Sequence, residues 1–169
     1  QTLNVSFENI QVEKEDETVD AIDQIAYSVT TERKGPFLRY LLKTEILEQT
    51  LIFVSSTRTA DNLHAKLIKN GISALTLHSK KTQSARTQAL QKFKEGSAQV
   101  LIATDILSRG IHIDLLPVVI NYELPRSPLD YVHRIGRTGR AHEKGKAITL
   151  LTEEDQHHFK IIQKKMKYF

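Results

Sequence analysis

Six short apolar runs recur along this sequence and limit the folds that are open to it. Each is nearly continuous in apolar residues and rich in β-branched side chains, as is typical of strands buried on both faces of a parallel sheet. They are residues 25–29, 51–54, 74–77, 100–103, 118–122 and 147–151. Helical stretches separate the runs. We therefore predict an α/β fold, with a mainly parallel β-sheet and helices on both of its faces.

Hydroxyl residues mark where four of the helices are expected to begin. Thr57 and Thr82 each precede an amphipathic stretch and are expected to cap it. Ser127 is followed by a proline and, three residues after the cap, by an acid, which is a strong helix start. Thr152 precedes three acidic residues and predicts the start of the last helix in the same way.

Length and composition narrow the class of protein. The 169 residues suffice for one domain with a full core, which we expect at residues 24–169, after a lead-in segment at residues 1–23. The chain has no cysteine, which excludes disulfides and thiolate metal sites. No apolar run approaches the roughly 20 residues of a membrane helix, and no signal pattern opens the sequence. A cytoplasmic protein without a membrane partner is therefore expected.

Polar and basic residues follow four of the predicted strands. In an open parallel sheet, ligands bind beyond the carboxyl ends of the strands. Hydroxyl groups and free backbone N–H groups at a helix start suit phosphate oxygens, and several of them along one edge suit a chain of phosphates. Taken singly, each is more simply a helix cap or a solvated charge. The residues concerned are Ser56 and Arg58, His78-Ser79-Lys80, Gln83 and Arg86, Thr104-Asp105, and the arginines that come after residue 122.

Those arginines gather around one short apolar helix. They are Arg126, Arg134, Arg137 and Arg140. Like charges at this density cost stability unless an anion lies near, and the net charge of +4 permits a polyanionic partner without requiring one. Gly136 and Gly139 shape the backbone between them, so a functional role is favoured over a solvated surface. His133 has no partner residue at ligand spacing, which favours a hydrogen-bonding role over a metal site.

Two segments carry a resemblance to a known family. VHRIGRTGRA, residues 132–141, resembles motif VI of the DEAD-box RNA helicases, and VLIATDILSRGIHI, residues 100–113, resembles their motif V. Weaker resemblances lie at residues 51–63, which look like motif IV, at the Q-x-x-R element of residues 83–86, and at residues 118–125. Order and spacing agree with the family over about residues 24–165.

The resemblance implies a RecA-like domain, the second of two in a helicase core, with residues 1–23 as the linker from the preceding domain. The first domain of the family carries the phosphate-binding loop and the acidic D-E-A-D box, and neither is present here. The implied substrate is ATP with Mg²⁺ held by that N-terminal domain, and the implied partners are RNA and the N-terminal RecA-like domain. An ATP-dependent RNA helicase acting as a monomer is expected, with this fragment inactive alone.

The family pattern also implies roles for individual residues. Arg137 and Arg140 are the expected catalytic arginine fingers, which reach the ATP γ-phosphate across the interdomain cleft. The expected ATP-binding or interdomain residues are Gly110, His112, His133 and Arg134, together with the two fingers. The expected RNA-binding residues are Ser56, Arg58, Gln83, Arg86, Thr104 and Asp105. Contacts with the RNA backbone imply binding that tolerates any sequence and depends strongly on salt.

Three positions depart from the family pattern and leave alternatives open. His112 stands where motif V has an aspartate that helps to hold the ribose, Ser79 stands where a glycine is common, and Lys80 stands where an acid is common. A helicase-like RNA-binding module with a weak or lost ATPase is therefore the second hypothesis. A stand-alone nucleotide-binding enzyme is the third, and the lack of a G-x-G-x-x-G element after any predicted strand counts against it.

Overall fold

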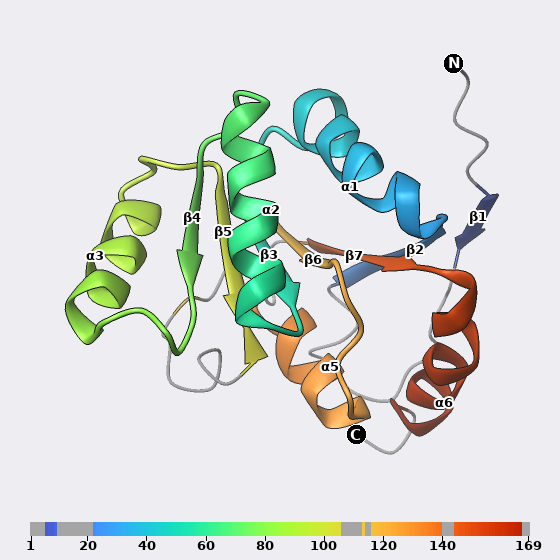
Figure 1. Ribbon diagram of the computed structural model, residues 1–169. Coiled ribbons are helices and arrows are strands. Elements are labelled where there is room, and N and C mark those ends of the chain that lie inside the picture. Colours follow the sequence, from blue (N-terminus) through green and yellow to red (C-terminus); the bar gives the residue numbers. More distant parts are fainter. Residues whose placement is uncertain (1–5, 10–21, 106–112, 114–115, 140–143, 167–169) are drawn as a thin grey trace.

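A twisted, mainly parallel sheet forms the centre of the molecule (Figure 1). The structure, a computed structural model, describes residues 6–9, 22–105, 113, 116–139 and 144–166. The strand order is β1-β2-β7-β6-β3-β5-β4, and every neighbouring pair from β2 to β4 is parallel, while β1 pairs antiparallel with β2. The strands are β1 Ser6–Asn9, β2 Ile22–Ser28, β3 Thr50–Val54, β4 Ala74–Leu77, β5 Val100–Thr104, β6 Val118–Asn121 and β7 Gly145–Leu151.

All six apolar runs are strands, so the predicted fold class is confirmed. The helices are α1 Thr31–Tyr40, α2 Thr57–Lys69, α3 Gln83–Lys94, α5 Pro128–Ile135 and α6 Gln156–Met166. A π-helical turn, η1 (Leu41–Glu45), extends α1, and a 3-10 turn, η2 (Glu153–Asp155), leads into α6. Among the residues that the structure describes, no helix has the length and apolar character that crossing a bilayer requires.

The helices cover both faces of the sheet, as Figure 1 shows. The alternation of side chains along β3 explains how one strand serves two cores. Ile52 and Val54 pack into the core beneath α1 and α2, whereas Leu51 and Phe53 point to the opposite face. On that face α3 covers the β4 and β5 side, and α5 and α6 cover the β2 and β7 side. Each such side chain, when fully buried, stabilises the fold by about 1.5–3 kcal/mol.

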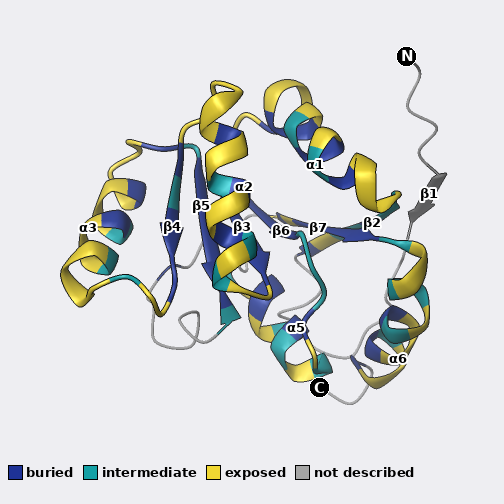
Figure 2. Ribbon diagram, in the orientation of Figure 1, coloured by how far each residue is buried: buried dark blue, intermediate teal, exposed yellow. Residues whose placement is uncertain are grey.

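Buried stripes on the helices face these cores, while their outer sides are exposed (Figure 2). In α2 the stripe consists of Ala60, Leu63 and Leu67, as an amphipathic helix requires. In α6 it consists of Phe159, Ile162 and Met166.

Three of the four predicted helix starts carry the expected hydroxyl cap or cap interaction. The Thr82 and Ser127 hydroxyl oxygens each accept a hydrogen bond of 3.1 Å from the backbone N–H three residues later. Thr152 donates from its backbone N–H and its hydroxyl to the Asp155 carboxylate, each at 2.9 Å. The predicted cap at Thr57 is wrong by one residue. Ser56 has the extended backbone of a cap and accepts from the backbone N–H of Thr59, while Thr57 is already helical.

Candidate functional site

The strands β3 and β6 lie side by side at the centre of the sheet, and the chain leaves them in opposite directions. From β3 it passes through α2 to β4, and from β6 it passes through α5 to β7. Such a switch point opens a crevice at the carboxyl ends of the strands, where α/β sheets bind ligands. Here the backbone N–H of Ser55, after β3, donates to the Glu123 carboxylate, after β6, at 2.9 Å.

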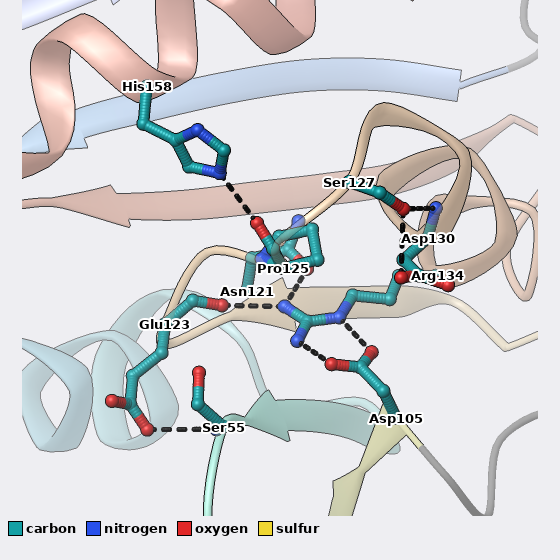
Figure 3. A network of polar contacts seen from close by, with 9 residues as sticks. All are labelled: Ser55, Asp105, Asn121, Glu123, Pro125, Ser127, Asp130, Arg134 and His158. Carbon is teal, nitrogen blue, oxygen red and sulfur yellow. Dashed lines mark hydrogen bonds and ion pairs between the residues drawn. The ribbon is translucent and has the colours of Figure 1, made fainter.

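A fully buried arginine ties the strand ends around this point together (Figure 3). The Arg134 Nε and Nη2 atoms donate to the two Asp105 carboxylate oxygens, both at 2.5 Å. Its Nη1 donates to the backbone oxygen of Glu123 at 2.6 Å and to Asn121 Oδ1 at 3.2 Å. The guanidinium also lies over the Phe53 ring, 5.1 Å from its centroid. We call Asp105, Asn121, Glu123 and Arg134 the Arg134 clasp.

The clasp satisfies a charge that would otherwise be very costly to bury. Four N–H groups of Arg134 have acceptors, and the fork geometry with Asp105 is the bidentate form that arginine favours. Removing one partner of a buried pair typically costs 3–5 kcal/mol, because the other charge is left uncompensated. The clasp therefore fixes α5 to the ends of β5 and β6 as one rigid unit.

Two predicted site residues thus contact each other. Asp105 was predicted to bind RNA and Arg134 to face another domain, yet the structure pairs their side chains, with 31% of the Asp105 side chain exposed and none of Arg134. Thr104, at the end of β5, is also buried and only 5% exposed. Thr104 therefore offers little surface to a ligand, whereas Asp105 is partly exposed but already paired with Arg134.

The start of α2 presents an open helix end beside the switch point. Ser56, Arg58 and Ser55 are exposed there. The first turn of α2 contains no acidic residue, so the positive end of the helix dipole is not neutralised by its own side chains. Free N–H groups of a first turn commonly bind phosphate oxygens.

The start of α3, like that of α2, has no acidic residue in its first turn. Arg86 Nη2 donates to Gln83 Oε1 at 2.8 Å, which orients the guanidinium. The Nε atom of Arg86 is buried and has no hydrogen-bond partner among the residues that the structure describes. A buried donor without an acceptor is costly, so the described residues do not fully satisfy the Arg86 side chain.

The turn between β4 and α3 is fixed by a buried histidine. His78 Nδ1 accepts from the backbone N–H of Lys80 at 3.3 Å, so Nε2 carries the proton and donates to the Asp61 carboxylate at 2.8 Å. This hydrogen bond is the main reason that the pKa of Asp61 lies below its ordinary value. The exposed Lys80 is thereby held on a defined turn.

The loop after α5, residues 136–139, lies at the other edge of the sheet. The Thr138 hydroxyl donates to the backbone oxygen of Leu116 and, at 3.2 Å, to that of Pro117, just before β6 begins. Leu116 N–H in turn donates to the Arg137 backbone oxygen at 3.1 Å. The helix α5 thus carries the chain from the carboxyl ends of the strands to their amino ends. Arg137 is partly exposed there, separate from the Arg134 clasp.

Some predicted residues are not joined to these groups. His133 lies exposed on α5. Gly110, His112 and Arg140 fall outside the described residues, so their predicted roles stay predictions.

Sequence reasoning missed three residues that shape the site. Asn121 and Glu123 complete the clasp, and the signal was a polar residue at the end of an apolar strand, since a buried amide needs partners. Lys34, in α1, is buried with its Nζ 4.9 Å from the centroid of the Tyr122 ring. Burial lowers the pKa of Lys34, against the opposing effect of Asp155 and Glu123. No sequence pattern marked that contact.

Comparison with known proteins agrees with this geometry. Residues 33–142 match the family described as helicase conserved C-terminal domain. The ATP-dependent RNA helicase DBP8 of Scheffersomyces stipitis is 38% identical over 148 residues, which cover 81% of this chain and 33% of that protein. The chain spans about a third of the length of the curated relatives that it matches.

Solved structures show the same fold. A DEAD box protein from Methanococcus jannaschii superposes with a TM-score of 0.83 at 36% identity, over 89% of this chain and 41% of that one. Dbp5 of Saccharomyces cerevisiae bound to RNA and ADP BeF3 superposes with a TM-score of 0.80 at 34% identity, over 92% of this chain and 43% of that one. The family match, the identities and the RecA-like fold agree, and the chain belongs to the DEAD-box ATP-dependent RNA helicases as a C-terminal helicase domain.

Proposed function

We propose that this chain works as the second RecA-like domain of an ATP-dependent RNA helicase, binding the RNA sugar-phosphate backbone and completing an ATP site on an N-terminal RecA-like domain. The Arg134 clasp is the observation that supports this most. It joins the end of β5, in the motif V-like segment, to α5, in the motif VI-like segment. A movement that RNA imposes on the strand ends is therefore transmitted to the loop that carries Arg137.

The proposed RNA contacts lie at the starts of α2 and α3. Ser56 and Arg58 are exposed at the first, while Gln83 orients Arg86 at the second, where one donor has no described acceptor. Two acid-free helix starts suit consecutive phosphates of one strand. The Dbp5 structure bound to RNA and ADP BeF3 has a similar fold.

Thr104 and Asp105 take a modified place in this proposal. The Asp105 oxygens already accept from Arg134, and a carboxylate repels phosphate. We therefore assign Asp105 to holding the end of β5 and leave direct contact with RNA to the open helix starts. Thr104, buried at the same strand end, is proposed to contribute through its backbone.

Arg137 and Arg140 are the proposed arginine fingers. The partner domain would hold ATP and its Mg²⁺, and the two guanidinium groups would stabilise the charge that develops as the γ-phosphoryl group passes to water. Gly110, His112 and His133 are proposed to organise the nucleotide and the domain interface, and Arg134 to act there only by fixing the position of α5. RNA bound across both domains would close the cleft, and hydrolysis would release a locally separated strand.

A second candidate is an RNA-binding module with little ATPase activity. The histidine at position 112 supports it, because a neutral imidazole accepts only one hydrogen bond and a protonated one accepts none, whereas an aspartate accepts several.

RNA-stimulated ATP hydrolysis by the full-length protein tests the proposal, with Arg137→Ala measured beside the wild type. We expect stimulation in the wild type and a fall in kcat of about 10³-fold or more in the variant, with the RNA affinity unchanged. The isolated chain is expected to hydrolyse no ATP. RNA binding without hydrolysis in the wild type would favour the second candidate, and loss of RNA affinity in Arg137→Ala would contradict the finger role.

A further inference from the structure

The start of β7 has no room for a side chain. Gly145, the first residue of the strand, is buried. A Cβ atom added there would come closer than 3.0 Å to three atoms of the 136–139 loop, namely Thr138 Oγ1, the Gly139 backbone nitrogen and, at 2.8 Å, the Thr138 carbonyl carbon. Real Cβ atoms essentially never approach other atoms so closely. Two of the three atoms belong to the backbone, so a side-chain rotation could not relieve the overlap.

The loop that presses on Gly145 is fixed from its other side as well. The Thr138 side chain is fully buried, and its hydroxyl donates to the backbone oxygens of Leu116 and Pro117. A parallel bridge pairs Leu116 with Thr138. Lys146 N–H donates to the same Pro117 oxygen at 3.1 Å, which links β7 to this segment. The loop is therefore wedged between the residues before β6 and the start of β7, and any atom added at position 145 would push it outward.

Other glycines of the chain have a different reason to be glycine. Gly71 and Gly96 end α2 and α3 with φ angles of +78° and +79°, and a Cβ atom at either would meet nothing within 4 Å. At these two positions the backbone has a positive φ, which other residues rarely adopt. At Gly145, glycine is needed because the backbone of the 136–139 loop lies too close to β7 for any side chain.

We propose that Gly145 is a positioning residue for ATP hydrolysis, because the missing side chain lets the 136–139 loop lie against β7 and so sets where Arg137 is presented. This inference rests on the proposed finger role of Arg137. Gly145 itself lies eight residues along the chain from Arg137 and acts only through the backbone of Thr138 and Gly139. A displacement of about 1 Å in a catalytic group can cost about 10²-fold in rate.

The first experiment compares Gly145→Ala with Gly96→Ala in the full-length protein. Gly145→Ala is expected to lower kcat for RNA-stimulated ATP hydrolysis by about 10²-fold, with the KM for RNA unchanged, because the proposed RNA contacts lie at the other edge of the sheet. Gly96→Ala introduces strain at a positive φ at the end of α3, where an added Cβ atom meets nothing within 4 Å, so it controls for a general loss of stability and should keep kcat. A wild-type kcat in Gly145→Ala would overturn the inference, as would an equal loss of kcat in Gly96→Ala.

A double-mutant cycle separates this inference from the proposed function. If Gly145 acts through Arg137, then Gly145→Ala should cause no further loss of single-turnover rate in an Arg137→Ala background. If instead the rate losses of the two single variants multiply in the double variant, Gly145 acts independently of Arg137. A wild-type rate in Arg137→Ala alone would instead refute the finger role itself.

If Gly145→Ala does not fold, Thr138→Val tests the same dependence of kcat on the position of the 136–139 loop. Valine preserves the shape of the side chain but removes the hydroxyl that holds the loop to Leu116 and Pro117. We expect kcat to fall with RNA binding retained, and Thr138→Ser to recover most of the rate. An unchanged kcat in Thr138→Val would show that the position of the loop does not matter.

Discussion

Two arginines three residues apart in one short segment have opposite surroundings. Arg134 is fully buried, and four of its N–H groups donate to acceptors just after β5, on β6 and just after β6. Arg137 lies one turn further on, past the end of α5, and is partly exposed on a loop held by the Thr138 hydroxyl and backbone hydrogen bonds. The clasp holds a rigid strand end, while the loop presents a cation at a surface.

The two arginines of this segment differ because one lies on α5 and the other lies beyond its end. α5 ends at Ile135, and Gly136 follows it as the cap. Arg134 therefore shares the inward face of the helix with Tyr131 and Ile135, which are buried beside it. Arg137 lies beyond the end of the helix and is partly exposed. The arrangement links the proposed RNA side to the proposed ATP side through one helix of eight residues.

Breaking the clasp from its acidic side should have a large effect on stability. Asp105→Asn keeps the size of the side chain but removes the charge that pairs with the buried Arg134. We expect the free energy of unfolding to fall by about 3 kcal/mol in urea titrations of the chain, at the lower end of the range for buried pairs because Asp105 is partly exposed. Glu153→Gln, on the exposed turn before α6, is the matched control and should change it by no more than about 0.5 kcal/mol. Equal losses in the two variants would rule out a special role for the clasp.

Arg86→Ala sharpens the assignment of the RNA surface. Loss of one phosphate contact should weaken binding similarly for all RNA sequences and reduce the slope of log affinity against log salt by about 1. Lys92→Ala, in the last turn of α3, removes the same charge away from the proposed surface and should leave the slope nearly unchanged. A sequence-selective loss in Arg86→Ala, or equal slopes in both variants, would count against the assignment.

The smallest predicted effect concerns acid stability at the turn after β4. The His78 hydrogen bond lowers the pKa of Asp61 in the folded chain, so the carboxylate form stabilises the fold above the ordinary value of 3.8. That contribution is lost as the pH falls through the lowered folded-state pKa. The difference in unfolding free energy between wild type and Asp61→Asn should therefore be larger at pH 7 than at pH 2. A difference that does not depend on pH would show that the carboxylate charge is irrelevant.

Much of the fold could be predicted from local patterns. The six apolar runs identified the strands β2 to β7, because strands buried on both faces leave continuous apolar segments. The helix α1 carried no such signal, since Gly35 and Pro36 lie inside it. Packing of Phe37 and Leu38 beneath the sheet face outweighs that low propensity. The cap shifted from Thr57 to Ser56 because only the backbone conformation distinguishes two adjacent hydroxyl residues.

The sequence indicated which residues belong to the site, but not which of them contact each other. The arginine segment and the strand ends stood out in the sequence, yet the pairing of Asp105 with Arg134 spans 29 residues and depends on the order of the strands. The wedge at Gly145 depends likewise on how the loop folds back onto β7, and a lone glycine before a strand gives no sign of it. Contacts between distant segments are set by topology, which local spacing does not encode.

One pair of unfolding measurements tests the division of roles most directly. Arg134→Met and Arg137→Met make the same change three residues apart, and urea titration gives the free energy of unfolding of each. We predict a loss of about 3–5 kcal/mol for Arg134→Met, which leaves Asp105 without its buried partner, and a clearly smaller loss for Arg137→Met, whose side chain is partly exposed. Similar losses for the two variants would contradict the claim that one arginine holds the fold and the other is presented for catalysis.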